Sequence, residues 1–377
     1  MNFSSDNAAG AHPKIVEALV RAAAAGPFPA YGADPITSNV EKRLSEIFER
    51  ETAVFLVATG TAANALALSA LTPPWGGVLC AAEAHVEIDE CGAVEAISGA
   101  RVMPVEAPDG RLTRAALEAR VAPIRIGDQH HVQPAAVSIT QATEAGTVYA
   151  PHQVGAVGDF CRDHGLHLHM DGARFANALV SIGCSPAELT WKAGVDVLSF
   201  GATKNGALAA EAVVFFKPEL ARDFLYRRKR AGHLFSKMRF LSAQLETYLE
   251  DGLWLANARH ANALATRLAY GLVDISGIEL EYPVEANELF VRLPAKVADA
   301  LFAAGFHFYP WGAPPPDSET PGLFRFVTAF DSDPGAVDAL IATARTAAAP
   351  AEAVEIAMAD AAPVPAGDGN EAIAEIA

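Results

Sequence analysis

Two residues with the potential for covalent and electrostatic catalysis stand at the ends of strand-like segments. Lys204 lies in the small-residue sequence GATKNG (201–206), directly after the apolar run VDVLSF (195–200). Lysines are normally solvated, whereas a lysine presented among Gly and Ala at a strand end can be partly desolvated, and such an amine can form a Schiff base. Taken alone, the segment more often represents a loop lysine that points into solvent.

Asp171 changes the interpretation of Lys204. It ends the strand-like segment LHLHM (166–170) and precedes Lys204 by 33 residues. A pyridinium nitrogen needs a carboxylate partner to stay protonated, and a lysine with such an aspartate is the usual protein contribution to a pyridoxal phosphate (PLP) site. The ordinary alternatives are a helix N-cap for Asp171 and a surface ion pair for the nearby Arg174.

A third strand-to-helix turn could bind a phosphate group. Gly60 and Thr61 separate the strand-like AVFLVA (53–58) from a helix of small residues. Free N–H groups and the positive end of a helix dipole favour anions at such a turn. Many turns contain Thr and Gly, so the motif is weak by itself. The order of phosphate turn, aspartate and lysine on successive strand ends is far more specific than any one of them.

Three histidines are further candidates. His85 follows the strand-like GGVLCA (76–81), where a flat imidazole could stack on a planar cofactor, although a lone histidine is as often structural. His130 and His131 precede the strand-like AAVSITQ (135–141) and could act as bases near neutral pH.

The elements that must position these side chains alternate between strand and helix from about residue 34 to residue 216. Such repeated units predict an α/β fold with a mostly parallel sheet covered on both faces. After residue 217 the pattern is helical to about residue 270. A smaller α+β region then has expected strands at 288–293, 306–309 and 323–330 and expected helices at 296–305 and 333–347.

This pattern divides the chain into four parts. We expect an N-terminal arm (1–30) with one short helix at 13–24 and a large domain (31–250). We expect a small C-terminal domain (251–349), whose first helix links it to the large one. Residues 350–377 are rich in Ala, Pro, Glu and Gly, lack Lys and Arg, and are expected to be a disordered acidic tail.

Composition excludes several classes of protein. Of the 377 residues, 51% are hydrophobic and 19% charged, which suits a large packed core. The net charge of −17 disfavours nucleic acid as a partner. The sequence contains no uninterrupted apolar run of about 18 residues, so no membrane span is predicted. Four cysteines without a CxxC pair indicate neither a metal site nor a redox dithiol. With no secretory signal pattern at the N-terminus, we expect a cytoplasmic protein.

Several segments together resemble a known family. TGTAAN, EAHVEIDECGA, HMDGARFANA and SFGATKNG, with SSDN near the start and AYGADP, closely resemble the fold-type I PLP enzymes of the threonine aldolase / β-eliminating lyase group. The low-specificity L-threonine (phenylserine) aldolases are the most similar branch. The resemblance covers roughly residues 3–347, and DGAR followed by Asn177 and Ala178 is its most specific part.

The resemblance implies a role for each matching position. Lys204 would bind PLP, Asp171 would pair with the ring nitrogen, and His85 would stack on the ring. The other implied cofactor-binding residues are Gly60, Thr61 and Thr203, together with Lys229 and Arg239. Ser5, Arg174 and Arg325 would bind the substrate carboxylate, and Tyr31 is a further residue implied to bind substrate. His130 would lie near the substrate's β-hydroxyl, with Asp89 close by.

Tyr31, Lys229 and Arg239 match positions that reach a neighbouring subunit's site, which implies a homo-oligomer, usually a tetramer. This chain departs from the family in two motifs near predicted site residues. The usual glycine-rich run before Arg239 reads GHLFSKM (232–238), and the family's HFP near the catalytic histidine is here HHV (130–132), so His130 and His131 both stay candidates. The basic run at 227–230 fits a solvated helix face and a subunit interface equally well.

The predicted reaction is PLP-dependent retro-aldol cleavage of L-threonine, L-allo-threonine and related L-β-hydroxy-α-amino acids such as phenylserine, giving glycine and an aldehyde. The alternatives are another PLP reaction, β-elimination or transamination, and a non-catalytic PLP-binding protein. A histidine near a β-hydroxyl disfavours the former. The presence of both Arg174 and Arg325 disfavours the latter.

Overall fold

The computed structural model describes residues 1–317 and 320–349, so the expected tail at 350–377 lies outside the described residues. The larger sheet contains seven strands: β1 (Ala53–Val57), β2 (Gly76–Ala81), β3 (Arg101–Val105), β4 (Gln133–Thr140), β5 (His167–Gly172), β6 (Val197–Gly201) and β7 (Glu211–Phe215). Their order is β1-β7-β6-β5-β4-β2-β3. Along this order, the adjacent strands β3, β2, β4, β5 and β6 pair in parallel, whereas β7 is antiparallel to both β6 and β1. The sheet is therefore mostly parallel, as predicted.

The helices before the small sheet are α1 (Pro13–Ala24), α2 (Pro35–Ile47), α3 (Gly60–Leu71), α4 (His85–Ile88), α5 (Ala93–Ser98), α6 (Arg114–Val121), α7 (Pro151–His164), α8 (Phe175–Ile182), α9 (Pro186–Leu189), α10 (Phe224–Arg230), α11 (Arg239–Leu249) and α12 (Leu253–Val273). Short 3-10 helices are η1 (Asp6–Ala8), η2 (Trp191–Ala193), η3 (Thr203–Asn205), η4 (Pro218–Ala221) and η5 (Glu250–Gly252). Local chemistry sets several starts. Thr59 caps α3 by accepting the N–H of Ala62 at 3.2 Å, and Asp34 caps α2 by accepting that of Thr37 at 2.9 Å.

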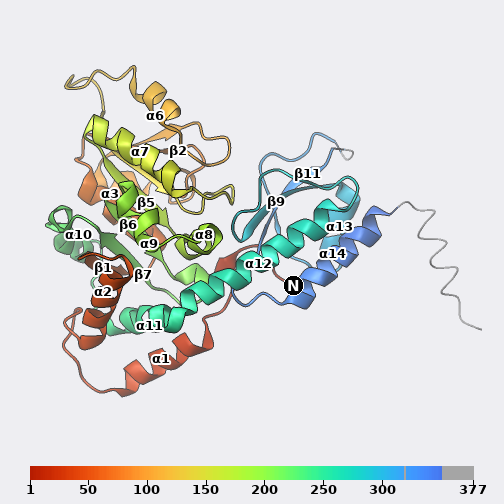
Figure 1. Cartoon of the computed structure of the whole chain (residues 1–377), viewed down its shortest axis with the longest axis horizontal. Coiled ribbons are helices and arrows are strands. Elements are labelled where there is room, and N and C mark those ends of the chain that lie inside the picture. The colour runs from red at the N-terminus through yellow and green to blue at the C-terminus, as the bar shows by residue number, and fades with distance from the viewer. Residues whose placement is uncertain (318–319, 350–377) are drawn as a thin grey trace, which may run out of the picture.

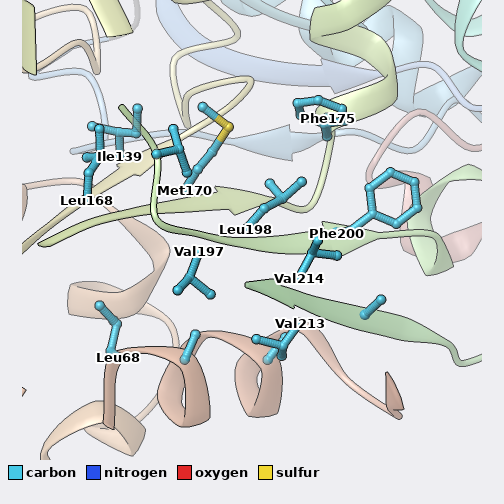
Figure 2. Packing of buried hydrophobic residues seen from close by; sticks show 14 of the residues in the cluster. Leu68, Ile139, Leu168, Met170, Phe175, Val197, Leu198, Phe200, Val213 and Val214 are labelled. Atoms are coloured by element: carbon cyan, nitrogen blue, oxygen red, sulfur yellow. The ribbon is translucent and has the colours of Figure 1, made fainter. Parts of the chain in front are cut away.

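The main hydrophobic core lies on both faces of the larger sheet. In Figure 2, Val197 and Val213 face the helix that carries Leu68, while Met170 and Leu198 point to the opposite face. The helix is α3, and nine of its twelve residues are buried. A helix without a polar face must be covered all round, so α3 is fixed against the sheet, and its N-terminus is fixed with it.

The second sheet has four antiparallel strands, in the order β10-β11-β9-β8. They are β8 (Glu279–Leu280), β9 (Glu288–Leu293), β10 (Tyr309–Pro310) and β11 (Gly322–Val327), packed with α13 (Ala295–Ala303) and α14 (Pro334–Ala348). The long helix α12 runs from the larger body to this smaller one (Figure 1). The two bodies have separate hydrophobic clusters, and the domain boundaries expected from the sequence stay predictions.

The N-terminal segment packs with the smaller body. Phe3 belongs to its hydrophobic cluster, donates its N–H to the carbonyl of His307 at 2.7 Å, and accepts the N–H of Val327 at 2.8 Å. The strand expected at 306–309 is wrong in extent, because His307 pairs with Asn2 and only Tyr309–Pro310 joins the sheet. These contacts bring residues 4–7 beside the start of β9.

Among the described residues, no helix combines the length and the apolar character needed to cross a bilayer. Within the same residues, no group of three or more His, Cys, Asp or Glu side chains is arranged to hold a metal ion.

Candidate active site

A cavity of about 340 Å³ lies at the carboxyl ends of the central strands. In open α/β sheets this edge is the usual place for a ligand. Thr140 at the end of β4 is in register with Asp171 of β5, which is in register with Ser199 of β6. The cavity collects the following predicted site residues: Gly60, Thr61, His85, Asp171, Arg174, Thr203 and Lys204.

A buried glutamate, which was not predicted from the sequence, holds the turn that carries Lys204. Glu211 opens β7, and its Oε2 accepts the N–H of Ala202 at 3.0 Å. Burial raises the pKa of Glu211 to about 7, although hydrogen bonds from Thr203 and Ala202 and the charge of Lys204 act in the opposite direction. One carboxyl group therefore fixes the backbone that presents the lysine. The hydroxyl of Thr203 accepts the N–H of Ala210 at 3.3 Å.

Asp171 is positioned by two donors. Its Oδ1 accepts the N–H of Ala173 at 2.9 Å, and its Oδ2 accepts Nδ2 of Asn64 at 2.7 Å. Because α8 begins only at Phe175, Asp171 is not a helix N-cap. Two residues earlier on β5, burial lowers the pKa of His169 to about 4, so this histidine is neutral at physiological pH. Asp171 thus faces the cavity as an oriented carboxylate.

A chain of hydrogen bonds joins His85 to Asp171. Nδ1 of His85 lies 2.9 Å from Oε1 of the buried Glu90, and the same oxygen accepts Nδ2 of Asn64 at 2.9 Å. Asn64 therefore donates to Glu90 and Asp171 together. The hydrogen bond to Glu90 raises the pKa of His85. The backbone N–H of His85 also donates to Glu144 at 2.8 Å, and burial raises the pKa of that glutamate to about 7.

Arg174 forms a buried ion pair, so the surface ion pair considered for it is wrong. Its Nε and Nη2 donate to the two carboxylate oxygens of Asp6 at 2.7 and 2.9 Å. Its Nη1 lies 3.1 Å from Oε2 of Glu288. Arg325 stands nearby, with Nη1 3.9 Å from Oε1 of Glu288 and Nη2 donating to the carbonyl of Ser4 at 3.1 Å.

Arg325 lies outside the cavity lining, and so do three further predicted residues, Ser5, Asp89 and His130. The hydroxyl of Ser5 accepts the N–H of Asn7 at 3.1 Å and so caps η1, while Asn7 itself reaches the cavity. Asp89 is exposed at the end of α4. His130 is exposed on the loop before β4, where its backbone N–H donates to Asp128 at 2.9 Å. Their roles stay predictions.

The residues expected to reach a neighbouring subunit gather on another surface. Nζ of Lys229 lies 5.1 Å from the ring of the exposed Tyr31. Nε of Arg239 donates to the carbonyl of Ala22 at 3.4 Å. In the basic run, Arg228 is buried and donates to the carbonyl of Leu56, so the run is not uniformly a solvated face.

The cavity residues fit PLP. The N–H groups of Gly60 and Thr61 begin α3 and have no intrahelical acceptor, which suits a phosphate. Lys204 supplies an amine, and Asp171 supplies a carboxylate for a ring nitrogen. Within the described residues, buried polar atoms of Asn64, Glu90 and Glu144 at this cavity lack hydrogen-bond partners, which indicates that a polar ligand completes the site.

Sequence reasoning missed several polar residues in and beside this cavity: Asp6, Asn64, Glu90, Glu144, Glu211 and Glu288. A signal existed for two of them. Glu211 opens the apolar run EAVVFF and Glu288 opens ELFVRL, and an acid that begins a fully buried strand must find partners. The other four lie in polar or small-residue sequences without a comparable signal.

Comparisons with known proteins agree with this geometry. Residues 2–296 match the family described as "Beta-eliminating lyase". The chain is 44% identical over 344 residues to the low specificity L-threonine aldolase of Pseudomonas sp. (strain NCIMB 10558), covering 91% of this chain and 96% of that protein. The solved threonine aldolase of Leishmania major superposes with a TM-score of 0.86 at 29% identity, covering 92% of this chain and 99% of that one.

More distant structures share only the fold. The serine palmitoyltransferase of Sphingomonas wittichii is 17% identical, with a TM-score of 0.68 over 94% of this chain and 88% of that one. The matches and the cavity place this protein in one family, and the expected fold-type I architecture is confirmed. The chain belongs to the beta-eliminating lyase family.

Proposed function

We propose that this chain is a PLP-dependent aldehyde-lyase that cleaves L-threonine, L-allo-threonine and related L-β-hydroxy-α-amino acids to glycine and an aldehyde. The observation that carries the proposal is the single cavity that collects Lys204, Asp171, His85 and Arg174 at the strand ends. The similarity over almost the whole length of a curated threonine aldolase supports the same reaction.

The cofactor end of the cavity has four tasks, one for each group. When bound, PLP supplies an electron sink for cleavage of the Cα–Cβ bond. Nζ of Lys204 would be the amine that holds the cofactor. Asp171, oriented by Asn64, keeps a proton on the ring nitrogen. The N-terminus of α3 would hold the phosphate, and His85, whose Nδ1 lies 2.9 Å from Oε1 of Glu90, would contact the ring.

The reaction also needs a carboxylate anchor and a proton acceptor. Arg174 and Arg325 orient the substrate carboxylate, for which a guanidinium fork is well shaped. We infer that His130 takes the β-hydroxyl proton, directly or through water, with Asp89 close by. His85 is the competing acceptor because it lines the cavity, whereas His130 stands on the loop outside it. If His130 is the acceptor, His130→Phe loses turnover and His131→Phe retains it.

Incubation of the PLP-loaded protein with a substrate panel tests the reaction. We expect acetaldehyde and glycine from L-threonine and L-allo-threonine, and benzaldehyde and glycine from phenylserine. L-Serine serves as a comparison substrate. Ammonia and a keto acid without glycine would instead identify β-elimination, and an amino-group transfer would identify transamination. Bound PLP without consumption of any of these amino acids would favour a non-catalytic protein.

We also infer that the protein is a cytoplasmic homo-oligomer, with a tetramer as the expected state. Four free cysteines support a reducing compartment. The apolar side chains of Tyr31, Tyr226 and Leu208 are exposed, and Tyr31 lies beside Lys229. A second copy would cover them and bring cations to its neighbour's site. Light scattering of the eluting protein tests this, since a monomer would contradict it.

A further inference from the structure

Four charged side chains from separate segments meet beside the cavity, around Arg174, which lines it. We call this cluster the carboxylate end of the site. Asp6 lies in η1, Arg174 precedes α8, Glu288 opens β9, and Arg325 lies in β11. The carboxylates of Asp6 and Glu288 are 1% exposed, and the two arginine side chains are 11% and 18% exposed. The charges therefore interact in a region with little water, where an uncompensated charge is costly.

The charges of these four side chains cancel before any ligand arrives. Two guanidinium groups face two carboxylates, so a substrate carboxylate would be a third negative charge beside two positive ones. Lys204 is the further cation close enough to act on Asp6 and Glu288, and in the proposed reaction its amine is engaged by the cofactor. Binding of the substrate carboxylate thus requires that one of the protein's own carboxylates either take up a proton or move away from the arginines.

The two carboxylates are not equally well held. Asp6 accepts three hydrogen bonds, two from Arg174 and one from Nδ2 of Asn287 at 3.1 Å. Burial would raise the pKa of Asp6, but Arg174 and Lys204 outweigh it, and the pKa is lowered. Asp6 is therefore the permanent anion of the pair.

Glu288 is held less well. Its Oε2 lies 3.1 Å from Arg174 without hydrogen-bond geometry, and this buried oxygen has no hydrogen-bond partner in the described part of the chain. Its Oε1 is 3.9 Å from Arg325, whose buried Nε also lacks a partner there. Burial raises the pKa of Glu288, and the negative charge of Asp6 raises it further, against the lowering effect of the two arginines.

We propose that Glu288 takes up one proton from solvent when the carboxylate of an amino acid binds at Arg174 and Arg325. The proton neutralises the Glu288 carboxylate, the ligand carboxylate replaces it as the second anion, and no other bond forms or breaks. This proposal rests on the proposed function, because that function supplies the α-amino acid carboxylate. Glu288 is then a positioning residue that couples the binding of substrate to the uptake of a proton.

The proposal has a consequence for pH. The groups that face Glu288 are Asp6 from η1, Arg174 from the turn after β5, Lys204 from the turn after β6, and Arg325 from β11. Of these, Asp6 has a lowered pKa, and the others are cations. Where Glu288 is ionised in the free protein, carboxylate affinity falls by up to about tenfold for each unit of pH, since one proton must be bound with the ligand.

Glycine, the expected product, is the probe for the test, and Glu288→Gln is the variant because it is neutral with nearly the same shape. Calorimetry of the PLP-loaded protein in two buffers that differ in ionisation enthalpy counts the protons taken up. At about pH 8 we expect the wild type to take up close to one proton more than Glu288→Gln, and the variant to bind glycine about tenfold more tightly. Glu281→Gln, which alters an ion pair with Arg292 on the same small sheet, is the matched control and should behave as wild type.

Equal proton uptake by the wild type and Glu288→Gln overturns the proposal while leaving the proposed function intact. Absence of glycine binding by both proteins overturns the proposed function, and this proposal with it. If Glu288→Gln does not fold, inhibition of the wild type by propionate tests the proposal. Propionate carries a carboxylate but no amine, so it can occupy the carboxylate site without reacting with the cofactor. Its inhibition constant should rise between about pH 6 and about pH 8.5, and a constant value would refute the coupling.

Discussion

At the cofactor end of the cavity, the polar groups come from successive strand–helix turns of the larger sheet. At the carboxylate end, they come from the N-terminal segment, the turn after β5, and two strands of the smaller sheet. The first end presents a lysine, a helix N-terminus and an oriented aspartate. The second presents an arginine that is already bound to two of the protein's own carboxylates.

This difference shows how one cavity can handle two anions in two ways. The phosphate of a permanently bound cofactor needs N–H donors that are always available. The N-terminus of a helix provides them from the backbone, without an ionisable group. A substrate carboxylate must arrive and leave in each turnover. When no substrate is bound, the protein's own carboxylates pair with the arginines. Without them the guanidinium groups would be buried without a counter-ion, which costs free energy. Replacement of Lys204, Arg174 or Glu211 tests whether the two ends of the site bind their anions independently.

Replacement of Lys204 should have the largest effect and should affect the cofactor end. We expect Lys204→Ala to lose the visible absorbance of the covalently attached cofactor and to reduce kcat by at least about 10³-fold, because the attaching amine is gone. Absorbance spectra and turnover of L-threonine measure this. Lys192→Ala, which removes an exposed lysine paired with Glu49, is the control. Full turnover by Lys204→Ala would refute the assignment.

Replacement of Arg174 should affect the carboxylate end alone. Arg174→Lys keeps the charge but loses the two-pronged contact with Asp6, so we expect KM for the amino acid to rise by about 10²-fold and stability to fall by about 1–3 kcal/mol. Cofactor affinity should stay within about twofold of wild type. Kinetics, cofactor titration and urea unfolding measure the three quantities.

Arg292→Lys, at an exposed ion pair on the small sheet, is the control for Arg174→Lys. A parallel loss of cofactor affinity in Arg174→Lys would contradict the separation of the two ends.

The smallest effect concerns the protonation of Glu211 at the cofactor end. Its pKa of about 7 in the folded protein exceeds the ordinary value of 4.5, so the folded state binds more protons than the unfolded state between these values. The free energy of unfolding should therefore fall as pH rises through this range, by about 3 kcal/mol at most from this group. Glu211→Gln should lack that part of the decline in urea unfolding curves.

Glu219→Gln, an exposed glutamate in η4, should retain the wild-type decline. If Glu211→Gln and the wild type decline equally, Glu211 is ionised in the folded protein. The cofactor end would then contain a further buried anion and would resemble the carboxylate end more than the structure indicates.

The sequence was informative where the chemistry is carried by short motifs. Lys204, Gly60 and Thr61 each follow a strand and Asp171 lies at the end of one, and the carboxyl ends of neighbouring strands meet at one edge of a sheet. The order of three motifs was therefore enough to predict that they share a site. The strand Glu288–Leu293 was predicted with its observed bounds, because its apolar residues are flanked by Asn287 and Pro294.

The sequence was uninformative where the chemistry depends on partners from distant segments. Nothing in the order of residues indicates that Asp6 would bind Arg174, which is 168 positions away, or that Glu90 and Asp171 would share one amide of Asn64. For the same reason, the expected strand at 306–309 was wrong in extent, since His307 pairs with the N-terminal Asn2 and only Tyr309–Pro310 joins the sheet.

By itself, then, the sequence determined the fold class, the family resemblance and the cofactor end of the site, because these depend on local periodicity and on motifs at strand ends. Only the tertiary structure decided which charges compensate one another. A buried charge is set by its neighbours in space, and at the carboxylate end those neighbours are Asp6, Arg174, Glu288 and Arg325, contributed by four segments that the fold alone brings together.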